Sequence, residues 1–194
     1  RHKALGRQMS ESSRHAPLPP DWKGLVIPAA NIVGKTDLFP RADRLVGAYA
    51  ARRMYPETPS LLIVDFGTAV TIDCVSGDAY MGGLIFPGPR TALTALSREA
   101  AKLPRVNLDV RANEPTPGRN TTTSIQHGLV FGFACMVEGL TQRLKRQMSG
   151  PVKVLGTGGF ASSIARVSNV FDQVLPMLLL EGLRRLHYEE PGTD

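Results

Sequence analysis

The segment Leu61-Leu-Ile-Val-Asp-Phe-Gly-Thr-Ala-Val-Thr-Ile-Asp-Cys-Val75 contains two apolar runs on either side of a short turn. Apolar, β-branched runs around a glycine-containing turn predict a β-hairpin. Gly67 lets successive amides point at one spot, Thr68 adds a hydroxyl, and Asp65 stands at a strand end where it could hold a cation or a water. The hairpin is therefore a candidate phosphate site. From these residues alone, an ordinary hairpin with a polar turn explains the pattern equally well.

The segments around the hairpin extend it into a mixed α/β pattern. Residues 79–86 predict the third strand of a meander, and an alanine-rich run at 42–55 predicts a helix that Pro56 ends. Further helices are expected at 91–101, 121–148, 160–166 and 176–188, and extended segments at 103–109, 152–157 and 171–174. Residues 1–24 predict an irregular lead-in, and residues 25–27 a short strand.

Three further features are candidates for a binding site. Asp43 opens the alanine-rich helix, but its position alone favours a helix-capping acid. Thr121 begins the long helix, where amides and hydroxyls either bind an anion or simply cap the helix. The strand that ends at Thr157 runs into Gly158-Gly159 and a short helix. This order is a common way to bring backbone against a nucleotide, although it is weak evidence by itself.

The composition is that of a soluble globular protein. The 194 residues are 42% hydrophobic and 21% charged, which provides a sizeable core and argues against disorder. The net charge of +6 is compatible with an anionic partner, either a nucleic acid or a small substrate. Because the arginines are scattered, without a long basic block or interleaved aromatic residues, the pattern does not favour nucleic-acid binding.

The cysteines and the apolar segments predict a cytoplasmic protein. Cys74 and Cys135 are far apart and belong to no metal-binding pattern, so two buried, free thiols in a reducing compartment are expected. No apolar run approaches the roughly 18 residues that a membrane span needs. The N-terminal residues lack the apolar core of a signal peptide. We therefore expect no membrane partner.

Several short motifs follow one another in a specific order. They are Asp43-Arg44, Asp65-Phe-Gly-Thr-Ala-Val-Thr71, Tyr80-Met-Gly-Gly-Leu-Ile-Phe-Pro-Gly88, Ala101-Lys-Leu-Pro-Arg105, Gly118-Arg-Asn-Thr121, Gly128, Glu138-Gly139, Thr157-Gly-Gly159 and Leu179-Leu-Glu-Gly-Leu183. In this order they resemble the successive motifs of the type III pantothenate kinases, a family also named after the Bvg accessory factor. The resemblance runs from about residue 25 to residue 187.

The resemblance implies a fold and an activity. Members of this family have the ribonuclease H-like, two-domain α/β fold of the sugar kinase, heat-shock protein and actin superfamily, in which the domains clamp ATP. They phosphorylate pantothenate on its primary hydroxyl to give 4'-phosphopantothenate, the first step of coenzyme A synthesis. Residues 1–60 would then be the remainder of an N-terminal domain. Residues 61–194 would form the C-terminal domain, with the last helix packing back towards the first domain.

The resemblance also assigns roles to individual residues on the substrate side. Asp43 matches the acid that contacts the pantothenate hydroxyl and serves as general base, since a carboxylate within hydrogen-bond reach can accept the proton. Arg44, in the same motif, is expected on the substrate side. Thr121 matches a threonine that contacts pantothenate across a dimer interface, which implies a homodimer.

The nucleotide side is assigned in the same way. The phosphate-binding turn is matched by Gly67, Thr68 and Thr71, and the nucleotide-side turn by Gly158 and Gly159. Asp65 matches the carboxylate on the cation side of the phosphate turn. The family uses ATP with a divalent ion, usually Mg²⁺, and a monovalent cation such as K⁺ or NH₄⁺.

Two features depart from the family pattern. The family places a glycine two residues before the catalytic aspartate, where this chain has Arg41, which could contact the anionic substrate or crowd its pocket. The family also begins with a strand that ends in Asp-x-Gly-Asn-Thr, the first phosphate-binding turn, and that sequence is absent from these residues. The expectation is an incomplete N-terminal domain, and a chain that is inactive without its first motif.

Two alternative functions follow from these departures. A non-catalytic regulatory relative, such as a Bvg accessory factor-like transcriptional activator, is compatible with the positive charge, Arg41 and the missing motif. A kinase of the same fold acting on another small hydroxyl acid is compatible with Arg41 alone. Pantothenate phosphorylation remains the leading hypothesis, because it accounts for all the motifs together.

Overall fold

A computed structural model describes residues 42–99, 103–104 and 106–189 of the chain. The expected lead-in, the strand at 25–27 and Arg41 lie outside the described residues. In chain order the elements are α3 (Ala42–Met54), β1 (Ser60–Phe66), β2 (Ala69–Ser76), β3 (Ala79–Pro87), α4 (Pro89–Glu99), α5 (Thr121–Lys145), β4 (Val152–Thr157), α6 (Ala161–Ala165), β5 (Gln173–Val174) and α7 (Leu178–Glu189).

The strands form one mixed, five-stranded sheet with the order β3-β2-β1-β4-β5. The predicted hairpin is confirmed: β1 and β2 are antiparallel, and Asp65 is the partner of Thr71. β3 continues the meander antiparallel to β2, while β4 pairs with β1 in parallel and β5 with β4 in parallel. The central strand β1 is therefore flanked by β2 on one side and β4 on the other.

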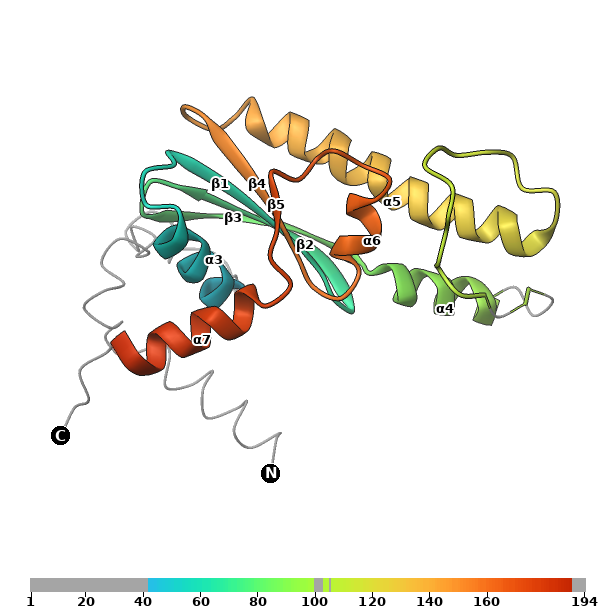
Figure 1. Cartoon of the computed structure of the whole chain (residues 1–194), viewed down its shortest axis with the longest axis horizontal. Helices are drawn as coiled ribbons and strands as arrows, with labels where there is room; N and C mark the ends of the chain where they lie inside the picture. The colour runs from blue at the N-terminus through green and yellow to red at the C-terminus, as the bar shows by residue number, and fades with distance from the viewer. Residues whose placement is uncertain (1–41, 100–102, 105, 190–194) are drawn as a thin grey trace.

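The alternation of side chains along β1 divides the core between the two faces of the sheet. Leu61 and Ile63 pack with α3 and with Leu178 of α7. Leu62 and Val64 point the other way and pack against α5 and α6. Figure 1 shows this layering, with α3 and α7 together on one side of the sheet and α5 and α6 on the other. Both faces of β1 are thus covered, which fits its continuous apolar sequence.

The first half of α5 extends beyond the sheet, where it lies beside α4 and the loop that joins the two helices (Figure 1). A smaller apolar cluster holds this part together, and it contains Leu108, Val110, Val130 and Phe131. The N-terminus of α5 is closed by Asn120, whose side chain accepts a hydrogen bond from the amide of Thr123. The local sequence therefore explains where this helix begins.

Within the described residues the expected helices and strands are confirmed, with ends that move by a few residues; the helix expected at 121–148 ends at Lys145. The prediction of two buried thiols is wrong for one of them, because Cys74 is buried and Cys135 is exposed. Ala134 and Val137 of α5 face the sheet. At about 100° per residue, Cys135 turns away from that face.

The sequence of elements, three antiparallel strands followed by alternating helices and parallel strands, is the ribonuclease H-like α/β arrangement expected from the sequence. α3 packs against α7 and against this sheet. The proposed division of the chain at residue 60 stays a prediction. Within the described ranges, no helix has both the length and the apolar character required to cross a bilayer.

Candidate active site

The candidate site lies at the edge of the sheet where β1 and β4 end. Because these strands are parallel, their carboxyl ends meet at one edge, and the hairpin returns β2 to the same place. Asp65 of β1 is paired with Thr71 of β2 on one side and with Thr157 of β4 on the other. The three polar side chains therefore lie side by side on the face of the sheet that α3 covers.

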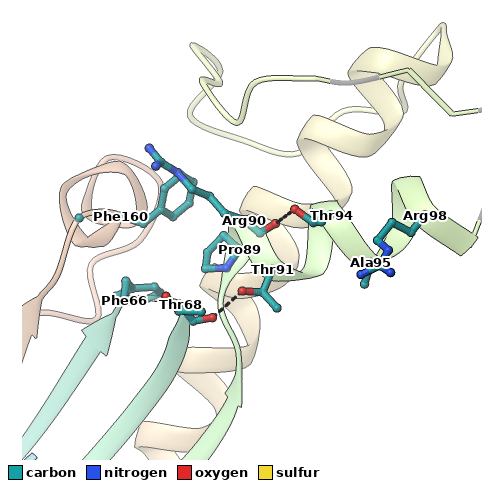
Figure 2. Close-up of a pocket in the computed structure, with 11 residues that line it drawn as sticks. Phe66, Thr68, Pro89, Arg90, Thr91, Thr94, Ala95, Arg98 and Phe160 are labelled. Atoms are coloured by element: carbon teal, nitrogen blue, oxygen red, sulfur yellow. Dashed lines mark hydrogen bonds between the residues drawn. The ribbon is translucent and has the colours of Figure 1, made fainter. Parts of the chain in front are cut away.

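The turn between β1 and β2 is held from outside by the start of α4. The amide of Gly67 donates to the carbonyl of Ala69 at 3.0 Å. The carbonyl of Thr68 accepts from the amide of Gly88 at 2.9 Å and from the hydroxyl of Thr91 at 2.6 Å. Figure 2 shows the Thr91 contact. The turn is thus anchored through its carbonyl, while both of its residues stay exposed to a ligand.

The turn after β4 fits directly against the end of β1. Gly158 has a φ of +85°, a conformation that side chains disfavour. A Cβ atom built on this residue would lie 2.3 Å from Oδ1 of Asp65 and 2.7 Å from the backbone of Phe66. Glycine at this position therefore allows the turn after β4 to lie in contact with the end of β1, next to the Gly67-Thr68 turn.

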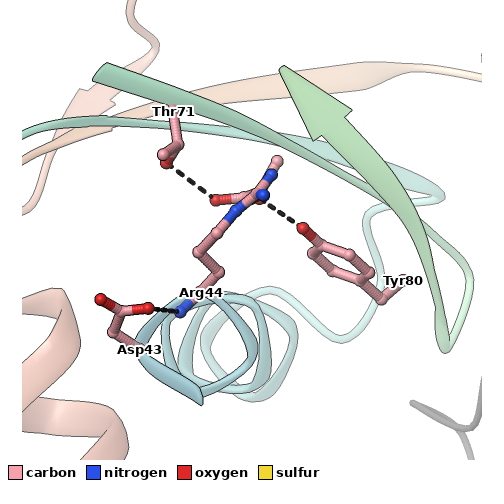
Figure 3. A network of polar contacts seen from close by, with 5 residues as sticks. Asp43, Arg44, Thr71 and Tyr80 are labelled. Atoms are coloured by element: carbon pink, nitrogen blue, oxygen red, sulfur yellow. Dashed lines mark hydrogen bonds and ion pairs between the residues drawn. The ribbon is translucent and has the colours of Figure 1, made fainter. Parts of the chain in front are cut away.

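The first turn of α3 brings Asp43 and Arg44 over the same face of the sheet (Figure 3). The Asp43 side chain is exposed, and its Oδ1 accepts a hydrogen bond from the Arg44 amide at 2.9 Å. The Arg44 side chain reaches β2, where Nε donates to Oδ1 of Asp73 at 2.7 Å. Nη2 lies 2.6 Å from the same oxygen. It finds no acceptor with hydrogen-bond geometry, although it is buried.

Asp73 is a buried carboxylate that gathers three neighbours. Besides Arg44, it accepts a hydrogen bond from the Tyr80 hydroxyl at 2.6 Å and one from the Thr71 hydroxyl at 3.1 Å. The Arg44 guanidinium also lies 6.0 Å from the centre of the Tyr80 ring. A side chain on Gly83 would come within 2.7 Å of Nη2 of Arg44. The glycine in β3 therefore leaves the space that the guanidinium occupies.

Two adjoining cavities flank the turn at Gly67 and Thr68. The first, about 260 Å³ in volume, lies between α3, α7 and the sheet. Its polar lining comprises Asp43, Arg44, Asp65, Thr68, Thr71, Asp73 and Thr157, with backbone from Gly67. The second, about 560 Å³, shares Gly67 and Thr68 and continues past Gly159, Phe160, Arg90 and Arg98. Figure 2 shows this second cavity. The turn thus separates a carboxylate-rich cavity from one that carries two arginines.

The charges in the first cavity act on one another. Burial, followed by the charges of Asp73 and Asp43, raises the pKa of Asp65 above the ordinary range for aspartate. Burial alone would lower the pKa of Arg44, but its hydrogen bond and charge interaction with Asp73 outweigh burial and raise it. Burial and the Asp73 carboxylate likewise raise the pKa of Tyr80, so its hydroxyl remains a donor. A cation beside Asp65 would relieve the repulsion among the carboxylates.

Within the described residues, no group of three or more Cys, His, Asp or Glu side chains is arranged to hold a metal ion by itself. Asp65 nevertheless offers carboxylate oxygens next to the threonines of β2 and β4. Oxygen ligands are those that Mg²⁺ and alkali cations prefer, and Mg²⁺ commonly takes one or two carboxylates together with substrate phosphates. The donors present therefore fit a cation that is shared with a bound phosphate.

Most of the residues singled out in the sequence lie around these two cavities, and Thr121 does not. It stands exposed at the start of α5, in the part of the helix that extends beyond the sheet (Figure 1). It lines neither cavity. Gly158 lies beneath Asp65, whereas Gly159 reaches the second cavity. Arg41 lies outside the described residues.

Sequence reasoning missed Asp73, Tyr80, Thr157 and the two arginines of α4. One signal was present for Asp73. Residues two apart on a strand share a face, so Asp73 had to lie on the same side of the sheet as Thr71. The register then places it opposite Ile63 and Gly83, beneath α3. The distance from Arg44 to Asp73 could not be read from the sequence, because the two are 29 residues apart and meet only in the tertiary structure.

Comparison with known proteins identifies a family for the chain. A family model described as type III pantothenate kinase matches residues 42–143. A protein named type III pantothenate kinase from Desulfovibrio desulfuricans is 87% identical over 149 residues, which cover 77% of this chain and 57% of that protein. One from Nitratidesulfovibrio vulgaris strain DP4 is 58% identical over 148 residues, covering 76% and 56%. The chain therefore spans somewhat more than half the length of these curated relatives.

A solved structure supports the fold alone. It is described as a conserved putative Baf family transcriptional activator from Campylobacter jejuni, and it is 22% identical with a TM-score of 0.50. The similarity covers 76% of this chain and 63% of that chain. The actin-like α/β fold predicted from the sequence is confirmed. From its matching family model and its position-by-position motifs, the chain belongs to the type III pantothenate kinase family.

Proposed function

We propose that the protein to which this chain belongs transfers the γ-phosphoryl group of ATP to the primary hydroxyl of pantothenate. The observation that carries the proposal is the convergence of the Asp43 carboxylate, the Arg44 guanidinium and the Gly67-Thr68 turn around one cavity. These groups come from separate elements, and they could act as a general base, a contact for an acidic substrate and a contact for phosphate. Phosphoryl transfer depends mainly on positioning and on stabilising charge, and such a cavity supplies both.

On the substrate side, Asp43 is the proposed general base. Its exposed carboxylate orients the attacking hydroxyl and accepts its proton as the bond to phosphorus forms. Arg44 is the proposed contact for the acidic substrate, because its guanidinium carries a positive charge and lines the same cavity as Asp43. Arg41, two residues before the base, is a further candidate for the substrate carboxylate. These three residues would set the preference for a hydroxyl acid.

On the nucleotide side, we assign the phosphates to the turn at Gly67 and Thr68, together with Thr71. Small, exposed turn residues let backbone amides approach phosphate oxygens closely. Gly158 and Gly159 would carry the nucleotide past the end of β4 into the larger cavity. The proposal is supported by the contact between the two turns, which brings both against one ligand.

Cations would be held at Asp65. The cavity gathers three carboxylates, and their mutual repulsion would oppose an incoming nucleotide. Asp65 would hold Mg²⁺, and the ion would neutralise phosphate charge when bound. A monovalent cation, K⁺ or NH₄⁺, would suit the carboxylate and hydroxyl oxygens at the strand ends. Asp65 would serve as the fixed ligand in either case.

Thr121 enters the proposal through a second copy of the protein. Since it lies away from both cavities of its own chain, a contact with pantothenate requires a homodimer in which α5 reaches the partner's site. The extension of α5 beyond the sheet supports such a reach (Figure 1). We further infer a domain boundary near residue 60 and a cytoplasmic location, where ATP is available.

The direct test uses the complete protein with ATP, Mg²⁺, K⁺ and pantothenate, and identifies the product by mass spectrometry. The proposal expects 4'-phosphopantothenate, formed together with an equal amount of ADP. A panel of other small hydroxyl acids, each at the same concentration, serves as the specificity control. Faster turnover of another acid would reassign the substrate. Stoichiometric DNA or protein binding without phosphoryl transfer would favour a regulatory role instead.

A further inference from the structure

Asp73 is a carboxylate buried in the middle of β2, among apolar residues. It is 3% exposed, and its strand neighbours Ile72 and Cys74 are apolar and buried. Burying a carboxylate is costly unless it is paired and hydrogen-bonded. Replacing a buried ion pair with apolar residues is often neutral or favourable for stability, so stability alone does not account for a charge at this position.

The partners of Asp73 connect it to the proposed substrate side. Its Oδ1 atom accepts from Nε of Arg44 at 2.7 Å and from the Tyr80 hydroxyl at 2.6 Å. Its Oδ2 atom accepts from Thr71 at 3.1 Å. The Arg44 side chain is only 12% exposed, so its charge depends on this carboxylate for compensation. Asp73 therefore fixes one edge of the guanidinium, and a guanidinium has donors left for a second acceptor.

The same contact fixes the position of Asp43. Arg44 directly follows the proposed base in the first turn of α3, and the two share a hydrogen bond between the Asp43 carboxylate and the Arg44 amide. Tying the Arg44 side chain to β2 holds the start of α3 over the sheet (Figure 3). Small displacements of reacting groups cost large factors in rate, so a rigid tie at this point has a functional consequence.

We propose that Asp73 is a positioning residue for the substrate side of the cavity: it orients Arg44 towards the acidic substrate and holds the helix turn that carries Asp43. The inference rests on the proposed function, since it names a determinant of that same reaction. Tyr80 and Thr71 complete the arrangement by donating a hydrogen bond each to the two oxygens of the carboxylate, Tyr80 to Oδ1 and Thr71 to Oδ2. In the proposed arrangement, Asp73 itself touches neither substrate nor nucleotide.

The test is a double-mutant cycle in the complete protein, with Asp73→Asn, Arg44→Gln and the double variant. Asparagine keeps the shape of the side chain and removes its charge. We expect Asp73→Asn to raise the KM for pantothenate at least about tenfold, because the Arg44 guanidinium loses the charged acceptor that fixes its orientation. The KM for ATP should change by less than about twofold. In the Arg44→Gln background the effect of Asp73→Asn should vanish, since both act through one guanidinium.

The controls separate this role from a structural one. Asp78→Asn alters an exposed aspartate of the β2–β3 turn and should leave both KM values unchanged. Additive effects of the two substitutions, or equal increases in both KM values, would overturn the inference. If Asp73→Asn does not fold, Tyr80→Phe takes its place in the cycle, with an expected increase of about threefold. An unchanged KM for pantothenate in Tyr80→Phe would also overturn the inference. Absence of pantothenate turnover in the wild type would refute the proposed function, and this inference with it.

Discussion

Substitution of Gly158 by alanine tests the contact between the two turns. In the folded chain this residue has a φ of +85°, and an added Cβ would lie 2.3 Å from Oδ1 of Asp65. It would also lie 2.7 Å from the backbone C and N atoms of Phe66. The side chain of Asp65 can rotate away, but the Phe66 backbone belongs to the central strand and has a neighbour on each side. The clash therefore cannot be relieved locally.

Two contributions set the expected loss of stability. A non-glycine residue in the left-handed region costs about 1–2 kcal/mol. Overpacking a well-filled site costs about 1–3 kcal/mol more. The free energy of unfolding should therefore fall by about 2–5 kcal/mol. For a chain of this size, that corresponds to a decrease in melting temperature of about 5–15 °C.

The neighbouring residue provides a matched control. A Cβ on Gly159 would meet no atom within 4 Å, and this glycine does not have a positive φ. Both variants, Gly158→Ala and Gly159→Ala, should be followed by thermal unfolding and by urea titration. We expect Gly159→Ala to unfold within about 1 kcal/mol of the wild type. Equal stability of the two variants would refute the close contact between the turns.

Two further predictions concern charged residues. Since the folded state raises the pKa of Asp65, its contribution to stability is present below the ordinary aspartate pKa and is lost as the pH rises through the raised value. In cation-free buffer, the melting temperature of Asp65→Asn minus that of the wild type should therefore increase as the pH rises from the ordinary aspartate pKa through the raised value. A difference that does not change with pH would contradict the raised pKa of Asp65. Nη1 of Arg52 donates to three main-chain carbonyls just after α3. Arg52→Ala should lower the free energy of unfolding by about 2–3 kcal/mol in urea titrations, whereas Arg53→Ala, at an exposed neighbour, should cost less than about 1 kcal/mol.

The sheet could be predicted from the sequence because its signals are local. The apolar runs at 61–64 and 70–75 and the small residues between them specify a hairpin, and the register pairs Asp65 with Thr71 as such a hairpin requires. The glycine pair after Thr157 marked a close approach of backbone. The order of several motifs along the chain then identified the family. No single motif would have been specific enough to do so.

The polar network beneath α3 could not be predicted in the same way. Arg44 looked like a substrate ligand by its place in a motif, yet its side chain is held by Asp73, whose sequence context is an ordinary strand. Contacts between residues far apart in sequence depend on how α3 crosses the sheet, which no local pattern encodes. Thr121 shows the opposite case: its motif was recognised, but the role that we propose for it would require a second copy of the chain.

We place the proposed phosphoryl transfer at the cavity beneath Asp43. The most direct measurement compares kcat of the complete protein with that of Asp43→Asn, using ATP, Mg²⁺, K⁺ and saturating pantothenate, with Asp78→Asn as the control. Loss of a general base should lower kcat by about 10²–10⁴-fold. The KM for ATP and the melting temperature should stay close to wild type, because the Asp43 side chain is exposed. Unchanged turnover in Asp43→Asn would contradict the account.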